Sequence, residues 1–188
     1  MLERLDMETR AYHAEVDAYW LDLMAADVTL GQYRSQLIRV YGFEAPLESA
    51  FAYTPNLTLA DRRDRTRSGL LAQDLLALGI TPAKITALPQ CNDITPFRDP
   101  AEALGWKYVA ERPTQLHNAI RRHLVTRLSD TASACAYLSA CDGLAAARWQ
   151  QLGVLLDEVT QHNAEATEQI VTSAKTAFAC MSAWFRHR

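Results

Sequence analysis

The chain uses helix-forming residues far more than strand-forming ones, and this bias restricts its fold class more than any other feature. Alanine and leucine supply 54 of the 188 residues, whereas valine and isoleucine supply 14. Alanine and leucine lose little conformational freedom in a helix, while β-branched residues suit a pleated sheet. Apolar residues make up 49% of the chain, which is enough to bury a sizeable core. The composition therefore predicts one all-α domain covering residues 1–188.

Glycine spacing and net charge exclude several classes of protein. The 7 glycines are scattered, so no loop can hold a phosphate through clustered glycines, and P-loop and Rossmann folds are ruled out. A net charge of −3 gives no general attraction to nucleic acid. Short basic runs, Arg62-Arg63 and Arg121-Arg122, are interpreted as solvated helix faces.

Cysteine usage and hydropathy favour a cytoplasmic location without membrane insertion. The four cysteines, which form neither a C-x-x-C pair nor a spacing typical of zinc sites, are Cys91, Cys135, Cys141 and Cys180. The first residues include Glu3, Asp6 and Glu8, where a signal peptide would be apolar. No uncharged apolar stretch reaches the roughly 18 residues of a membrane-spanning helix. We therefore expect reduced thiols.

Apolar residues at steps of three and four predict the helices of the first half of the chain. The first helix covers residues 2 to about 24, and its periodicity directs His13 inward. Thr29 and Gln32 have the spacing of a capping box that begins a second helix, which stops near residue 53. A third helix over residues 59–78 ends at Gly79, and residues 80–98 are predicted to be a connection with one short turn.

The clearest helix start is Asp99-Pro100-Ala101-Glu102, which combines an N-cap, a proline in the first position and a carboxylate in the third. This helix is expected to continue towards Leu128 with a kink at Pro113, because proline lacks a backbone donor and clashes with the preceding turn. Further helices are predicted around residues 134–140, 145–159 and 164–186.

Arg10, His13 and Asp17 form the one arrangement of side chains that suggests chemistry. Their spacing places them on one side of the first helix. A carboxylate one turn away can hold an imidazole N–H and direct the other ring nitrogen towards a metal. A core histidine satisfied by a neighbouring acid has the same spacing, so both interpretations remain open at this point.

Several segments, in order along nearly the whole chain, resemble the heme oxygenase family. Residues 8–17, ETRAYHAEVD, are similar to the family's opening Thr-Arg-x-x-His-x-x-x-Glu, with Asp17 where Glu is usual. Residues 105–111, GWKYVAE, resemble the Gly-x-x-Tyr-Val-x-Glu that begins its distal helix. Residues 30–48 and 137–184 resemble the second helix and the C-terminal half.

This resemblance implies an all-helical fold with a heme pocket between the first helix and a kinked distal helix. Heme would be both substrate and cofactor, cleaved with O2 and external electrons to biliverdin, CO and iron. His13 would be the axial ligand and Asp17 the group that orients it, while Arg10 would bind a heme propionate. Phe178 would pack on the macrocycle, or be an ordinary core aromatic. The implied partners are a reductase or ferredoxin and, as an acceptor of the bilin, a phytochrome.

The distal segment departs from the family pattern. Bacterial members typically continue with Gly-Ser-x-Leu-Gly-Gly, whereas residues 112–117 read RPTQLH. Leu116 and His117 should narrow the space at the heme or push the helix outward. His117 would then be a second axial ligand, or lie on the surface of a rotated helix. Two functions follow: a heme-degrading oxygenase, or a heme-oxygenase-like protein that binds heme or a bilin without turnover.

Overall fold

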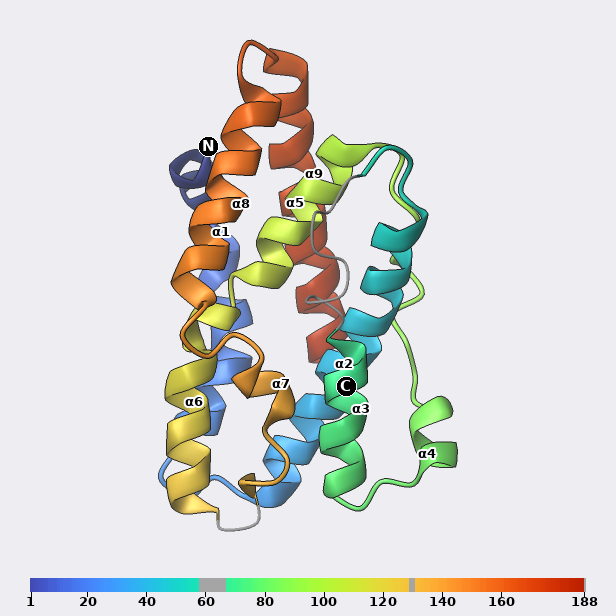
Figure 1. The fold of residues 1–188 in the computed structure, drawn as a ribbon, viewed down its shortest axis with the longest axis vertical. Helices are drawn as coiled ribbons and strands as arrows, with labels where there is room; N and C mark the ends of the chain where they lie inside the picture. The colour runs from blue at the N-terminus through green and yellow to red at the C-terminus, as the bar shows by residue number, and fades with distance from the viewer. Residues whose placement is uncertain (58–66, 129–130, 188) are drawn as a thin grey trace.

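Helices joined by turns and loops make up the described part of the chain, residues 1–57, 67–128 and 131–187 of a computed structural model (Figure 1). No strand occurs within those ranges. The helical elements in chain order are α1 (Leu2–Leu21), η1 (Asp22–Met24), α2 (Leu30–Tyr53), α3 (Ser68–Ala77), α4 (Pro82–Thr86), α5 (Pro100–Glu111), α6 (Thr114–Arg127), α7 (Ala136–Ser139), α8 (Ala145–Thr160) and α9 (Ala164–Arg186). The all-α prediction is confirmed. Residues 58–66, which include Arg62-Arg63 and most of the expected start of the third helix, lie outside the described ranges.

The predicted helix ends are formed by local hydrogen bonds. The Thr29 side chain accepts from the Gln32 backbone and the Gln32 side chain accepts from the Thr29 backbone, which completes the capping box of α2. Asp99 accepts a 2.9 Å bond from the Glu102 backbone at the start of α5. Gly79 has a φ of +81°, and this left-handed conformation, which glycine adopts readily, ends α3.

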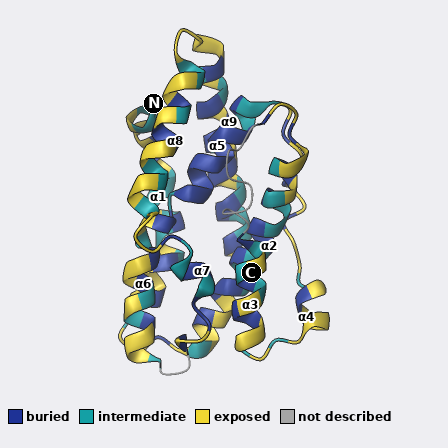
Figure 2. Ribbon diagram, in the orientation of Figure 1, coloured by how far each residue is buried: buried dark blue, intermediate teal, exposed yellow. Residues whose placement is uncertain are grey.

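Helix α5 occupies the centre of the fold and packs along α9 (Figure 1). Figure 2 shows α5 buried along almost its whole length, whereas α4 and α6 keep exposed faces. Gly105 allows the close approach, since a Cβ there would lie 2.6 Å from the Ile170 carbonyl oxygen and 2.7 Å from the Ala174 nitrogen. The α5 and α9 backbones therefore meet at this glycine.

The expected kink of the distal helix divides it into two helices, although Arg112 and Pro113 keep right-handed helical torsions. Helix α5 ends at Glu111 and α6 begins at Thr114, with Arg112 and Pro113 in a turn between them. Proline has no backbone N–H to donate, so the helical hydrogen-bond pattern is interrupted at this point, as predicted. Two helices with different directions result (Figure 1).

One continuous apolar cluster fills the space between the long helices. Its largest fully buried side chains are Trp20, Tyr33, Tyr108, Phe43, Phe178, Leu5, Leu37, Leu47, Leu71, Leu75, Leu104 and Ile120. These residues come from α1, α2, α3, α5, α6 and α9, so the core holds the candidate site's helices in place. Among the described helices, none has the length and apolar character needed to cross a membrane.

Candidate functional site

His13 lies on α1 with 12% of its side chain exposed, and both ring nitrogens have neighbours on the same helix. Nε2 is 2.9 Å from the Thr9 hydroxyl oxygen. That hydroxyl donates a 2.7 Å bond to the Leu5 carbonyl, so its oxygen is left to accept from the imidazole. Nδ1 is 3.7 Å from the Asp6 carboxylate. The Thr9 hydroxyl, one turn earlier on α1, therefore sets the orientation of the ring.

The surroundings of His13 favour its neutral form. Partial burial, followed by the Arg112 guanidinium, lowers the pKa of His13 below its usual value. A neutral imidazole keeps a lone pair on one nitrogen, which is the form that binds a metal. The surroundings of His13 therefore favour the form that an axial ligand requires.

Aromatic side chains cover one side of the His13 ring. The Phe178 ring lies 5.5 Å from the imidazole and stacks on Tyr12 at 5.8 Å with an interplanar angle of 5°. Tyr108 of α5 contacts Phe178 edge-on at 6.2 Å. Phe178 itself is fully buried. It braces the imidazole, and its expected contact with a macrocycle stays a prediction.

Asp17 contacts the turn between α5 and α6. Its carboxylate forms an ion pair with Arg112, and each side chain is 21% exposed. The carboxylate within 4 Å of His13 comes from Asp6. The pair joins α1 directly to the break in the distal segment, while Arg10 lies exposed one turn before His13. The role of Asp17 in orienting His13 stays a prediction, and the structure adds Arg112 as its partner.

His117 is buried in the core with 1% of its surface exposed, so the alternative of a surface histidine is wrong. Its ring contacts those of Trp20 and Tyr137, with centroid distances of 5.0 and 4.9 Å, and these two rings also stack on each other at 6.2 Å. Neither ring nitrogen has a hydrogen-bond partner among the described residues. Burial, together with the Arg67 guanidinium, lowers the pKa of His117 to about 3. Leu116, next to it, is half-buried and packs against the apolar cluster.

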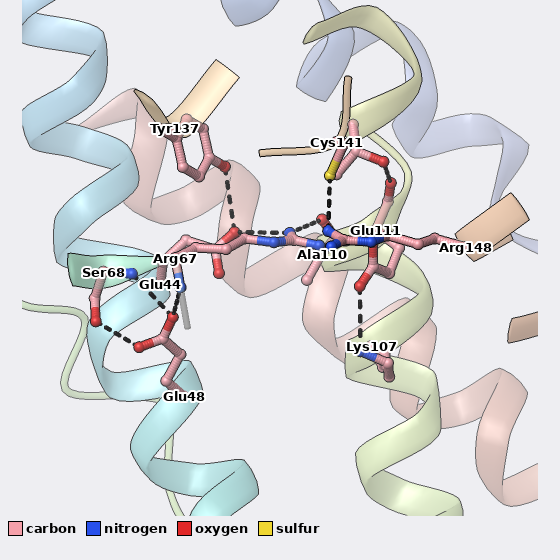
Figure 3. A network of polar contacts seen from close by, with 11 residues as sticks. Glu44, Glu48, Arg67, Ser68, Lys107, Ala110, Glu111, Tyr137, Cys141 and Arg148 are labelled. Atoms are coloured by element: carbon pink, nitrogen blue, oxygen red, sulfur yellow. Dashed lines mark hydrogen bonds and ion pairs between the residues drawn. The ribbon is translucent and has the colours of Figure 1, made fainter. Parts of the chain in front are cut away.

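A buried network of charged and polar side chains lies beneath the break between α5 and α6 (Figure 3). Arg67 is its centre: the guanidinium is 2.6 Å from Glu111 and 3.3 Å from Glu44, and donates a 2.9 Å bond to the Ala110 carbonyl. Lys107 pairs with Glu111 at 3.2 Å, one turn apart on α5. Two cations and two carboxylates thus compensate one another away from water, as buried charges require.

The same network connects four segments of the fold. The Tyr137 hydroxyl of α7 donates to Glu44 of α2 at 3.4 Å. Glu48, one turn later on α2, accepts a 2.9 Å bond from the Ser68 backbone at the start of α3. Burial raises the pKa of Glu44. At Arg67 burial acts to lower the pKa, but the Glu111 and Glu44 carboxylates outweigh it and raise the pKa well above the usual value. The guanidinium stays charged, and it holds α2, α5 and α7 together.

Sequence reasoning missed Asp6, Arg112 and the buried network. The i, i+4 spacing of Lys107 and Glu111 was a local signal for one pair. Arg67 and Glu44 are 23 positions apart, and Arg112 and Asp17 are 95 apart. No local pattern connects partners at such separations.

Comparison with known protein families gives a match over almost the whole chain. The family model described as heme oxygenase matches residues 1–187. The chain therefore belongs to the heme oxygenase family, whose function in general is the binding and degradation of heme. No curated protein and no solved structure matches the chain significantly.

Proposed function

We propose that this protein binds heme through His13 and cleaves it oxidatively to biliverdin, CO and iron, with O2 and electrons from an external donor. The observation that carries the proposal is the position of His13 on the first helix of a heme oxygenase family chain, packed against Phe178 in surroundings that favour its neutral form. The donor set fits heme chemically: a neutral nitrogen can bind iron, and the exposed Arg10 one turn earlier can bind a propionate. Bound heme supplies both the iron that activates O2 and the carbon that is oxidised.

The residues of this chain position the substrate and exclude water. Thr9 accepts a hydrogen bond from the imidazole along α1, and Phe178 packs against the ring at an interplanar angle of 49°. One ring nitrogen must exchange its contact on α1 for the iron. The aromatic side chains around Phe178 give the site an apolar wall, which strengthens electrostatic interactions inside it.

The Asp17–Arg112 ion pair has to open for a planar ligand to lie between α1 and the distal segment. It joins these two elements directly. Arg112 and Leu116 stand where bacterial family members typically carry glycine, so access depends on movement of the distal segment. This observation supports the second candidate function, a protein that binds heme or a bilin without turnover.

Heme turnover distinguishes the two functions. The purified protein is mixed with hemin and a chemical reductant under air, and its absorption spectrum is followed. An oxygenase loses the Soret band and develops biliverdin absorbance, whereas a stable heme spectrum indicates the binding protein. We further propose a reductase or ferredoxin as the natural electron donor, a phytochrome as the bilin acceptor and a cytoplasmic location. Reconstitution with each partner tests the first two proposals, and localisation of the native protein tests the third.

The axial role of His13 is tested by His13→Ala. The substitution removes the nitrogen donor, so the axial nitrogen signature in the optical and spin-resonance spectra should be lost. His187→Ala is the matched control, because His187 is an exposed histidine at the end of α9. An unchanged spectrum in the His13 variant would show that another residue binds the iron.

A further inference from the structure

Two cysteines that are 89 positions apart in the sequence come together where the connection before α5 crosses α9. Cys91 belongs to this connection, and its backbone N–H donates a 2.8 Å bond to the Gly42 carbonyl of α2. Gly42 permits the close packing, because a Cβ there would lie 2.5 Å from both the Pro89 carbonyl oxygen and the Trp184 ring. The connection is thus fixed against α2 and α9, and Cys91 faces Cys180 of α9.

The spacing of the two sulfur atoms suits a shared metal ion. Their Sγ atoms are 3.5 Å apart. Two thiolates on a tetrahedral zinc ion, each with a bond of about 2.3 Å, lie about 3.8 Å apart. A disulfide requires about 2.05 Å. The pair therefore needs only a small adjustment to bind a metal and a larger one to form a covalent bond.

Asp93 supplies a third ligand. A carboxylate oxygen of Asp93 and the two Sγ atoms all lie within 4.8 Å of one another. Cys91 is buried, Cys180 is half-buried and Asp93 is exposed, so the cluster opens to solvent on the Asp93 side. Three protein ligands with one position open to water is a common arrangement for zinc.

We propose that Cys91, Asp93 and Cys180 form a binding site for a thiophilic divalent cation, zinc in the first instance. Soft thiolate ligands select zinc over magnesium or calcium, which prefer oxygen. Binding releases both thiol protons to solvent and transfers no electron. The bound ion joins the connection before α5 to α9. This site is separate from the heme function, because none of its ligands is among the residues proposed to bind heme.

Cobalt substitution tests the site. The untagged full chain, reduced and freed of metal, is titrated with Co²⁺ without oxygen. We expect one equivalent to bind with a thiolate-to-cobalt charge-transfer band, which Zn²⁺ then displaces. Cys91→Ser and Cys180→Ser should abolish the band, and Asp93→Asn should weaken cobalt binding at least tenfold. Because Asp93 is exposed, the last variant keeps the fold and tests the carboxylate directly.

Cys135→Ser is the matched control, because Cys135 is a buried free thiol outside the cluster. It should keep the band, and far-ultraviolet circular dichroism checks that every variant is folded. The proposal is overturned if the reduced protein shows no thiolate band, or if the band survives in Cys91→Ser. It is also overturned if Cys91 and Cys180 form a disulfide in air and the reduced pair binds no cobalt. Heme binding by the same variants is measured separately, so failure of either proposal is distinguishable from failure of the other.

Discussion

His117 is a titratable side chain in a position where a positive charge is strongly disfavoured. Its ring packs against those of Trp20 and Tyr137, and burial lowers its pKa to about 3 from the usual 6.5. Because the folded state resists protonation, the contribution of His117 to stability is present above pH 6.5 and is lost as the pH falls towards 3. The loss amounts to at most about 1.4 kcal/mol per pH unit.

Replacing His117 with phenylalanine should therefore reduce the acid sensitivity of the fold. Phenylalanine keeps an aromatic ring packed against Trp20 and Tyr137 but carries no titrating group. Between pH ~6.5 and pH ~4.5 the wild type should lose about 2–3 kcal/mol more of its free energy of unfolding than His117→Phe. Urea unfolding at each pH measures the difference, and carboxylate titrations common to both chains cancel. Equal losses would show that His117 is protonated in the folded protein at pH ~4.5.

Arg112 controls, in our proposal, the separation of α1 from the distal segment. Its partly buried ion pair with Asp17 should stabilise the closed arrangement by about 1 kcal/mol, so Arg112→Ala should tighten heme binding roughly fivefold. Titration of hemin into the protein measures the affinity. Asp17→Asn breaks the same pair and keeps the guanidinium. If heme binding were weaker in Arg112→Ala but not in Asp17→Asn, Arg112 would contact the heme itself.

At the scale of elements, the contact of α5 with α9 depends on a single missing side chain. A methyl group at Gly105 would meet backbone atoms of α9, which cannot move without displacing the helix. The gain in helix propensity is at most about 1 kcal/mol, whereas overpacking typically destabilises by about 1–3 kcal/mol or more. The packing effect is the larger of the two.

Gly105→Ala should therefore lower the free energy of unfolding by about 2 kcal/mol, measured by denaturant titration. Gly69→Ala in α3 is the control, because nothing lies within 4 Å of a Cβ built there. It should be neutral or slightly stabilising, since alanine favours the helix. A Gly105 variant as stable as this control would mean that α9 moves away at little cost.

At the scale of the whole molecule, the buried charges around Arg67 connect helices from both halves of the chain. Arg67→Met keeps much of the side-chain volume and leaves Glu44 and Glu111 with less compensation in the interior. Breaking a buried ion pair in this way destabilises a protein by about 3–5 kcal/mol. Urea unfolding of Arg67→Met should show a loss of this size.

Arg4→Met provides the comparison, since Arg4 pairs with Glu168 at the surface and its side chain is 40% exposed. Removal of this surface pair should change the unfolding midpoint little, because solvent already screens the interaction. If the two variants had equal effects, the buried network would contribute no more than a surface pair does.

The sequence by itself determined the all-α class, the family and most helix boundaries. Capping residues such as Thr29 and Asp99 act within one turn, and amphipathic periodicity repeats every three or four residues, so both are visible along the chain. The helix break after Glu111 is of the same kind, because the proline acts on its own turn.

Only the tertiary structure decided which side chains meet. It paired Asp17 with Arg112, buried His117, placed Arg67 among carboxylates and brought Cys91 to Cys180. These contacts join residues from different elements, and their partners depend on the angles and distances at which the helices pack. Burial, which lowers the pKa of His117 and raises that of Glu44, likewise arises only when several helices enclose one position.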